Sequence, residues 1–207
     1  MTTGGEGGML TTNDEALWEK AWSFKDHGKS WDAVFRRQHP PGFGFRWLHE
    51  SFGTNWRMTE MQAAIGRIQL RKLPGWLGTR ARHAATLGAC LARIPALRVA
   101  CPPDHAGHAW YKYYAFIRTE GLAPGWDKDR IMNAVNAEGV YCVSGSCGEI
   151  YQEKAFEQGG LRPPVRLPVA RELGETSLMF LVHPTLSEAD LLDTCRAVEK
   201  VFAAAAR

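Results

Sequence analysis

Two polar side chains, Asn55 and Arg57, stand directly before a predicted helix, at a position that suits the binding of an anion. Thr59 and Gln62 have the spacing of a capping box, so the helix should begin near Thr59, and apolar residues then follow at helical spacing. Backbone amides and the helix dipole at such an N-terminus favour a negatively charged group. On spacing alone, an exposed turn with only local hydrogen bonds is the simpler interpretation.

A glycine-rich run, TTGGEGG at residues 2–8, is the second segment whose composition suits a ligand. Glycine lets a backbone turn tightly and brings its amide groups close to a bound molecule. Met9 and Leu10 predict a short buried strand after it, and Thr12 and Glu15 have capping-box spacing for a helix. Loop, strand and helix in this order are typical of part of an α/β sheet.

Both segments resemble signatures of the DegT/StrS-type sugar aminotransferases, which use pyridoxal 5′-phosphate (PLP). The first family motif is Thr-Thr-Gly-(Gly)-Glu-Gly-Gly with an apolar pair and Thr-Asn-Asp after it. The second is Asn-aromatic-Arg-Met-Thr-Glu-(Leu/Met)-Gln-Ala-Ala, and residues 55–64 carry it without a break. The resemblance covers nearly the whole chain and implies an α/β fold, the C-terminal part of the fold-type I PLP-dependent transferases. Residues 1–95 would form the end of the large PLP-binding domain and an interdomain helix, and residues 96–207 a small C-terminal α/β domain.

The resemblance also implies roles for single residues. In relatives the motif asparagine reaches the PLP phosphate of the neighbouring subunit, so Asn55 is expected to bind phosphate in a homodimer with shared active sites. Glu6, Arg57 and Ser146 are expected to face the substrate, and a structural role for Arg57 stays open. Many relatives have a Tyr-Pro-Pro-like stretch where this chain has residues 144–151, so the identity of the sugar does not follow.

In the family, the glycine-rich run directly follows the lysine that holds PLP as a Schiff base, and no lysine precedes it here. We therefore expect a longer enzyme with its catalytic lysine upstream of Met1, and we expect this chain alone to be inactive. Lys20, Lys25 and Lys29 do not stand at that position. The implied reaction moves an amino group from glutamate or glutamine to a keto-sugar or a cyclitol. The alternative is a non-catalytic relative that acts as a binding or regulatory subunit.

The remaining elements follow from periodicity and turn residues. Residues 13–24 predict a helix that Gly28 closes, and residues 29–54 a long aromatic-rich loop. Such a loop fits an active-site mouth or subunit interface, or else a self-packed surface segment. Beyond it the sequence predicts helices at residues 77–94, after Asp127 and after Ser187, and strands at residues 108–117, 140–143 and 177–182.

Composition excludes several classes of function. A net charge of +3 without a basic block argues against a nucleic-acid partner. No apolar stretch approaches the roughly 20 residues of a membrane span, and no secretory signal opens the chain, so we expect a cytoplasmic protein. Five irregularly spaced cysteines indicate free thiols, and without a second Cys or His pair at zinc spacing we expect no metal.

Overall fold

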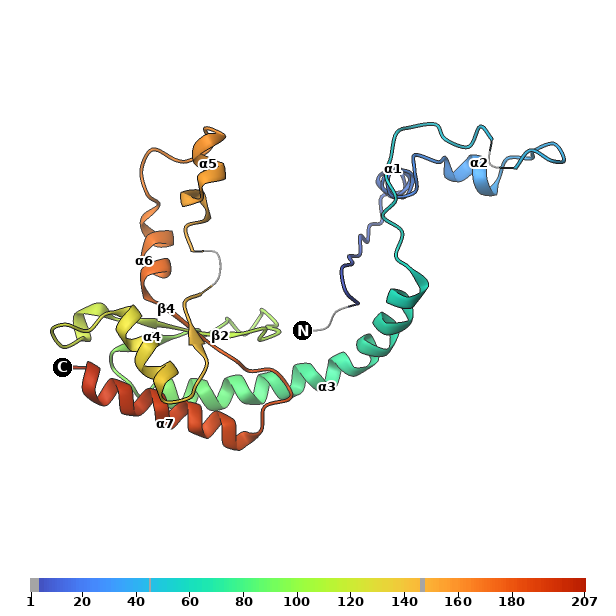
Figure 1. The fold of residues 1–207 in the computed structure, drawn as a ribbon. Coiled ribbons are helices and arrows are strands. Elements are labelled where there is room, and N and C mark those ends of the chain that lie inside the picture. The colour runs from blue at the N-terminus through green and yellow to red at the C-terminus, as the bar shows by residue number, and fades with distance from the viewer. Residues whose placement is uncertain (1–3, 45, 146–147) are drawn as a thin grey trace. The chain divides into compact units, whose positions relative to one another are not determined.

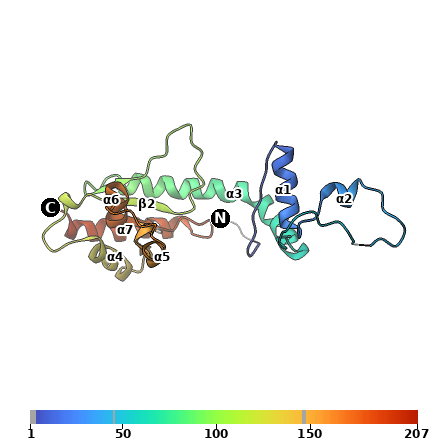
Figure 2. The same cartoon turned by 90° about the horizontal axis from the view of Figure 1, so that it is seen from above.

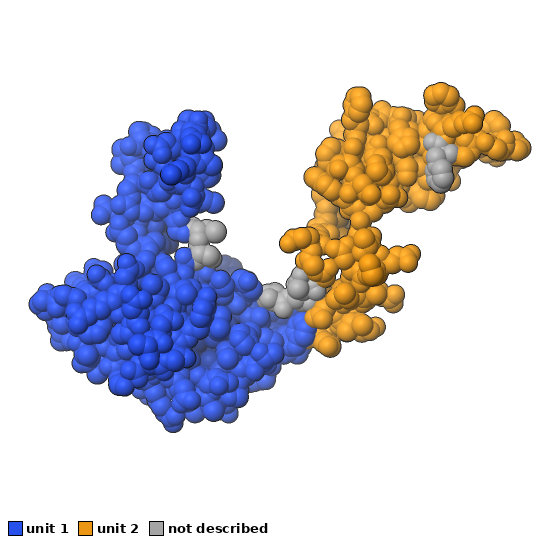
Figure 3. Space-filling view, viewed as in Figure 1, with its two compact units in different colours: residues 1, 73–207 blue, residues 2–72 orange. Residues whose placement is uncertain are grey.

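The computed structural model describes residues 4–44, 46–145 and 148–207. The chain divides into two compact units (Figure 3). Residues 2–72, orange in Figure 3 and unit 2 in its key, are called the first unit below, and residues 73–207, blue and unit 1 in the key, are called the second unit. This division lies within a long helix. The boundary expected between residues 95 and 96 concerns the domains of a longer enzyme and stays a prediction.

The helices of the first unit are α1 (Glu15–Lys25), α2 (Trp31–Phe35) and the beginning of α3 (Glu60–Leu91) (Figure 1). Asp14 caps α1, because its carboxylate accepts a hydrogen bond from the Leu17 N–H at 3.0 Å. The cap expected at Thr12 is wrong by two residues, since the Thr12 hydroxyl accepts the N–H of Asp14 instead, at 3.1 Å. Gly28 has a φ of +82°, so the predicted left-handed stop after α1 is confirmed.

The aromatic segment at residues 29–54 contains α2, which its irregular pattern did not predict. Trp31 on α2 packs edge-on against Trp18 and Trp22 of α1, with ring centroids 4.9 and 5.0 Å apart. This part of the segment therefore packs on its own unit. Trp47 and Phe52 do not, because their side chains are 79% and 100% exposed.

The first unit has little core of its own. Among its described residues, only Asp26, Gly28, Ala33 and Leu48 are buried. The strand expected at Met9 and Leu10 is not formed, and both side chains are exposed. A strand needs a neighbouring strand to pair its backbone groups, and no described residue supplies one here.

Helix α3 begins at the predicted capping box and continues without interruption to Leu91. The Gln62 N–H donates to the Thr59 hydroxyl at 3.3 Å, and Thr59 N–H donates to Gln62 Oε1 at 3.1 Å, which confirms the box. The separate helix expected at residues 77–94 is wrong, because Pro74 lies inside one continuous helix. Pro74 removes a single main-chain hydrogen bond, and the ladder resumes on both sides of it.

The second unit is a four-stranded sheet with helices on both faces. Its strands are β1 (Leu97–Val99), β2 (Tyr113–Ile117), β3 (Cys142–Val143) and β4 (Ser177–Phe180). Its helices after α3 are η1 (Thr119–Gly121), α4 (Lys128–Ala137), η2 (Ile150–Gln152), α5 (Lys154–Gln158), α6 (Pro168–Thr176) and α7 (Glu188–Ala205). The order β1-β2-β4-β3 is antiparallel throughout, so the α/β content expected here is present but without parallel pairing.

Alternation along β2 decides which helix covers which face. Tyr113, Ala115 and Ile117 are buried in the core that α3, α4 and α7 share, whereas Tyr114 and Phe116 point toward α6. Figures 1 and 2 show α3 and α7 alongside one another beneath the sheet, with α6 rising from its other side. The strands are shorter than predicted, because pairing ends where the neighbouring strand does.

Local capping signals in the second unit are confirmed. Asp127 accepts the Arg130 N–H at 2.8 Å at the start of α4, and Ser187 and Asp190 form a reciprocal capping box on α7. Gly139, with φ +85°, follows the end of α4. No helix in the described part of the chain is long and apolar enough to cross a membrane.

Candidate functional site

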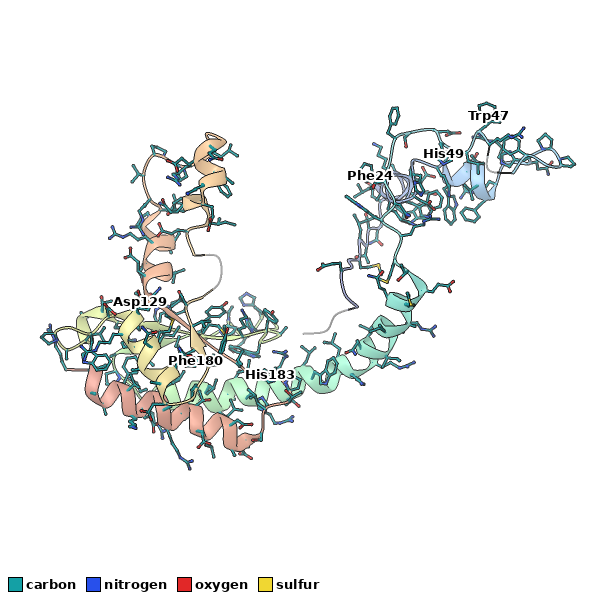
Figure 4. The ribbon with its side chains drawn as sticks, in the orientation of Figure 1. Phe24, Trp47, His49, Asp129, Phe180 and His183 are labelled. Atoms are coloured by element: carbon teal, nitrogen blue, oxygen red, sulfur yellow. The ribbon has the colours of Figure 1, made fainter. Side chains whose placement is uncertain are left out.

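Main-chain hydrogen bonds join the end of α1 to the segment before α3. Thr54 N–H donates to the Phe24 carbonyl at 2.7 Å, and His27 N–H donates back to the Thr54 carbonyl at 3.0 Å. Trp56 N–H donates to Lys25 O at 2.9 Å. Figure 4 labels Phe24 and His49, which belong to these two segments. The pairing fixes the backbone on both sides of Asn55.

Two glycines allow this close approach. A Cβ on Gly28 would lie 1.8 Å from the Ser51 carbonyl oxygen, and one on Gly53 would lie 2.4 Å from the Gly28 nitrogen. No side chain fits at either position without moving backbone. The Gly28 carbonyl also accepts the N–H groups of Glu50 and Ser51, at 3.0 and 3.1 Å. The turn around Gly28 is therefore the structural base of the site.

Asn55 and Arg57, predicted from their spacing, are in direct contact. The Arg57 Nε–H donates to Asn55 Oδ1 at 3.0 Å, and the Arg57 backbone N–H approaches the same oxygen at 3.4 Å. The Arg57 guanidinium also lies 3.6 Å from Asp26 Oδ1 and 3.5 Å from His27 Nε2. Asn55 itself is exposed. The exposed amide of Asn55 thus lies beside a cluster of charged side chains, formed by Arg57, Asp26 and Lys29.

Asp26 is the one acidic group in this cluster, and it is buried. Lys29 donates to its carboxylate at 3.1 Å. Burial would raise the pKa of the Asp26 carboxyl, but the hydrogen bond from Lys29 and the charges of Lys29 and Arg57 outweigh it, so the pKa lies below its ordinary value. The carboxylate is therefore ionised at neutral pH and holds both cations in place.

The glycine-rich run lies against the first turn of α3. Gln62 Nε2 donates to the Glu6 carbonyl at 2.9 Å. A Cβ on Gly4 would lie 3.3 Å from the Gln62 carbonyl, and one on Gly7 would lie 3.1 Å from the Met58 methyl. The structure thus brings the backbone of Glu6 to the helix that Asn55 and Arg57 precede. A substrate-facing role for the Glu6 side chain, which is exposed, stays a prediction.

The fourth predicted residue, Ser146, lies outside the described residues. Three residues further along the chain, Glu149 forms a two-pronged ion pair with Arg166, which lies just before α6. The Tyr151 hydroxyl donates to Glu149 at 2.6 Å and accepts the Leu167 N–H at 2.9 Å. Arg166 also reaches Glu175 at 2.9 Å. We call Glu149, Tyr151, Arg166 and Glu175 the Glu149 clasp.

The Glu149 clasp predicts a pH dependence. Hydrogen bonds from Arg166 and Tyr151 outweigh burial and lower the pKa of Glu149 to about 2. Because the folded-state pKa is lowered, the stabilisation is fully present above about pH 4.5 and is lost as the pH falls toward about 2. We expect the protection of residues 148–176 against hydrogen exchange, relative to the intrinsic exchange rate at each pH, to fall over this range, and Glu149→Gln to remove most of that pH dependence.

Glu157→Gln is the matched control, because Glu157 pairs with Arg162 in the same unit but is 61% exposed. Its exchange profile should follow the parent. A Glu149→Gln variant that retains the full acid sensitivity of the parent would show that another group causes it.

A hollow of about 300 Å³ lies between β2 and α6, next to the Glu149 clasp. Tyr114 and Phe116 of β2 line one wall, and Ala170 and Leu173 of α6 line the other. Ser177 contributes a hydroxyl, which accepts the Gly145 N–H at 3.2 Å. The hollow therefore borders the loop in which substrate contacts are expected.

A profile of the DegT/DnrJ/EryC1/StrS aminotransferase family matches residues 1–199. The chain belongs to this family. Its members use PLP. The two motifs around Glu6 and Asn55 are therefore those of a sugar aminotransferase family member, as their resemblance indicated.

Three relatives illustrate the match. The X-ray structure of an aminotransferase from Psychrobacter cryohalolentis is 54% identical, has a TM-score of 0.91, and is matched over 98% of this chain and 53% of its own. Spore coat polysaccharide biosynthesis protein SpsC of Bacillus subtilis is 29% identical, over 95% of this chain and 50% of its own. A dTDP-3-amino-3,4,6-trideoxy-alpha-D-glucose transaminase of Streptomyces venezuelae is 26% identical, over 95% and 46%. The chain spans about half the length of the relatives it matches.

Sequence reasoning missed Asp26 and Glu149 as parts of these arrangements. Asp26 lies in the helix end that Gly28 was predicted to close, and its partner Arg57 lies far along the chain. Glu149 stands in the segment singled out for substrate contact, but Arg166, which pairs with it, belongs to no predicted element. Neither pairing leaves a local spacing signal, so only the fold reveals them.

Proposed function

We propose that this chain is the C-terminal part of a PLP-dependent aminotransferase that acts on a keto-sugar or a cyclitol. Glutamate or glutamine supplies the amino group, and the enzyme is a homodimer with shared active sites. Membership of the family and the 54% identical aminotransferase support the reaction. The named transaminase of Streptomyces venezuelae, together with SpsC, supports a sugar substrate.

The observation that carries the proposal is the exposed amide of Asn55 among cations. A phosphate monoester needs hydrogen-bond donors and positive charge. Asn55 offers its amide N–H groups, and Arg57, Lys25 and Lys29 supply the charge nearby. The amide donors of Asn55 and the positive charge around it therefore suit the phosphate of PLP.

PLP, when bound, supplies the electron sink that transamination requires. The residues of this chain would bind the cofactor and position the substrate. Asn55 would donate to the phosphate held in the neighbouring subunit, the glycine-rich run at residues 4–8 would allow close backbone approach, and Glu6 and Arg57 would face the substrate. The lysine and the acid that complete the site belong to the preceding half of the enzyme.

Asn55→Ala tests the assignment in the full-length enzyme. We expect the affinity for PLP to fall by about 1.5–3 kcal/mol, because a hydrogen bond to a charged phosphate is lost. Absorbance titration of the apoenzyme with PLP measures it. The matched control is Asn133→Ala, which removes an exposed asparagine in the other unit. Unchanged PLP affinity in Asn55→Ala would refute the phosphate-binding role.

The sequence encoded upstream of residue 1 separates this proposal from the non-catalytic alternative. An open reading frame with a lysine immediately before Thr2, preceded by a cofactor-binding half, supports the enzyme. If the codon there specifies another residue and the full-length protein takes up no PLP, the binding or regulatory subunit is the correct assignment.

A further inference from the structure

The contacts of Asn55 with Arg57 fix the orientation of the Asn55 side-chain amide. Its Oδ1 faces two donors of Arg57, the Nε–H at 3.0 Å and the backbone N–H at 3.4 Å. A guanidinium has donors only and cannot accept, so the carbonyl side of the amide must face Arg57. The NH₂ side then faces the other way. Among the described residues, Asn55 Nδ2 donates to none.

Arg57 is in turn held by Asp26. The guanidinium Nη1 lies 3.6 Å from Asp26 Oδ1, and Lys29 donates to the same oxygen. The Asp26 side chain is 11% exposed, whereas that of Arg57 is 47% exposed. A half-exposed arginine has many rotamers, and a buried carboxylate whose own position is fixed selects one of them. Asp26 is fixed because its backbone pairs with Asn55 in an isolated bridge.

We propose that Asp26 is a positioning residue for cofactor binding, acting through Arg57 to hold the Asn55 amide with both N–H donors directed at the phosphate. The inference rests on the proposed phosphate-binding role of Asn55 and adds the residue that orients it. Asp26 itself does not touch the ligand. A freely rotating amide would turn its oxygen toward the phosphate part of the time. In that orientation the amide oxygen and the phosphate oxygens repel each other, and no hydrogen bond forms.

The sign of the effect separates positioning from simple electrostatics. Asp26→Asn removes a negative charge close to an anion site, so charge alone predicts tighter PLP binding. Positioning predicts weaker binding, because Arg57 and then the Asn55 amide lose their fixed orientation. We expect the dissociation constant of PLP to rise about 3- to 10-fold, the equivalent of one ordinary hydrogen bond.

The experiment compares PLP with pyridoxal, which lacks the phosphate, by titration of the full-length apoenzyme. Asp26→Asn should weaken PLP and leave the affinity for pyridoxal unchanged. General damage to the fold would weaken both, and that result overturns the proposal. So does unchanged or tighter PLP binding.

Two further variants keep the test decisive. Arg57→Lys keeps the positive charge at a half-exposed position but removes the Nε–H that donates to Asn55 Oδ1, so it is informative even where Asp26→Asn does not fold. Charge alone predicts unchanged PLP binding in this variant, whereas positioning predicts weaker binding of PLP and unchanged binding of pyridoxal. The double variant Asp26→Asn with Asn55→Ala should bind PLP no more weakly than Asn55→Ala alone, since the two residues act in series. If the losses of PLP affinity in Asp26→Asn and Asn55→Ala add up in the double variant, the proposal is wrong.

Failure of the inference and failure of the proposed function give different results. If Asn55→Ala leaves PLP binding intact, the phosphate-binding role is wrong. If Asn55→Ala weakens PLP binding and neither Asp26→Asn nor Arg57→Lys does, the proposed function stands and the positioning role is wrong.

Discussion

Replacing Gly28 with alanine will destabilise the turn that carries Asp26 and Asn55 by roughly 2–5 kcal/mol. Two costs add. The backbone at Gly28 has a φ of +82°, which a residue with a Cβ rarely adopts, and the new Cβ would lie 1.8 Å from the Ser51 carbonyl oxygen. Neither the turn nor the crossing segment can move without breaking the hydrogen bonds between them.

Hydrogen exchange at Thr54 and Trp56 in the full-length protein measures the loss, because both N–H groups are bonded across this turn. Gly42→Ala is the matched control. Gly42 also has a positive φ, +78°, but a Cβ there meets nothing within 4 Å. Only the conformational cost of roughly 1–2 kcal/mol applies to it. Equal exchange rates in the two variants would show that the steric contact at Gly28 is relieved.

Leu178→Ala will lower the free energy of unfolding of the second unit by about 2–5 kcal/mol. Leu178 lies in β4, between β2 and β3, and its side chain is fully buried. Truncation removes buried methyl groups and leaves a cavity in a sheet that is covered on both faces, so the surroundings cannot collapse into it.

Urea unfolding followed through the exchange of β2 and β4 amides checks this value. The control is Leu161→Ala, the same truncation at a leucine that is 72% exposed in the same unit. Its effect should stay within about 0.5 kcal/mol. A similar loss at Leu161 would mean that the free-energy change does not come from core packing.

The two units differ in how far their own residues stabilise them. In the second unit, buried residues from three helices and the sheet form one core. In the first, exposed apolar side chains such as Met9, Phe52 and Met61 outweigh the four buried residues. This imbalance accords with the proposal that the first unit completes a larger domain, where such side chains would be covered.

Capping motifs were predictable because their partners are three residues apart. Thr59 with Gln62, and Ser187 with Asp190, form the expected hydrogen bonds. The error at Thr12 arose because two acceptor side chains, Thr12 and Asp14, stand close enough to compete. The local pattern shows that a helix begins there, but only the backbone geometry selects the residue that caps it.

Strands were predicted less well, because pairing is not local. Runs of aromatic and apolar residues marked β2 and β4, but their ends depend on where the neighbouring strand stops. β1 went unrecognised, since three residues beside Ile117 carry no period of their own. The expected strand at Met9 and Leu10 has the right composition and no partner among the described residues, so it does not form.

The sequence by itself determined the family and the capping boxes that open α3 and α7, and it placed Asn55 and Arg57 together before α3, because each depends on short runs of adjacent residues. Only the tertiary structure decided that Asp26 and Arg57 meet, and that Glu149 pairs with Arg166. Those contacts join residues far apart in the chain. Asp26 and Arg57 meet because two glycines let one backbone segment cross another, a steric condition that no spacing along the sequence records.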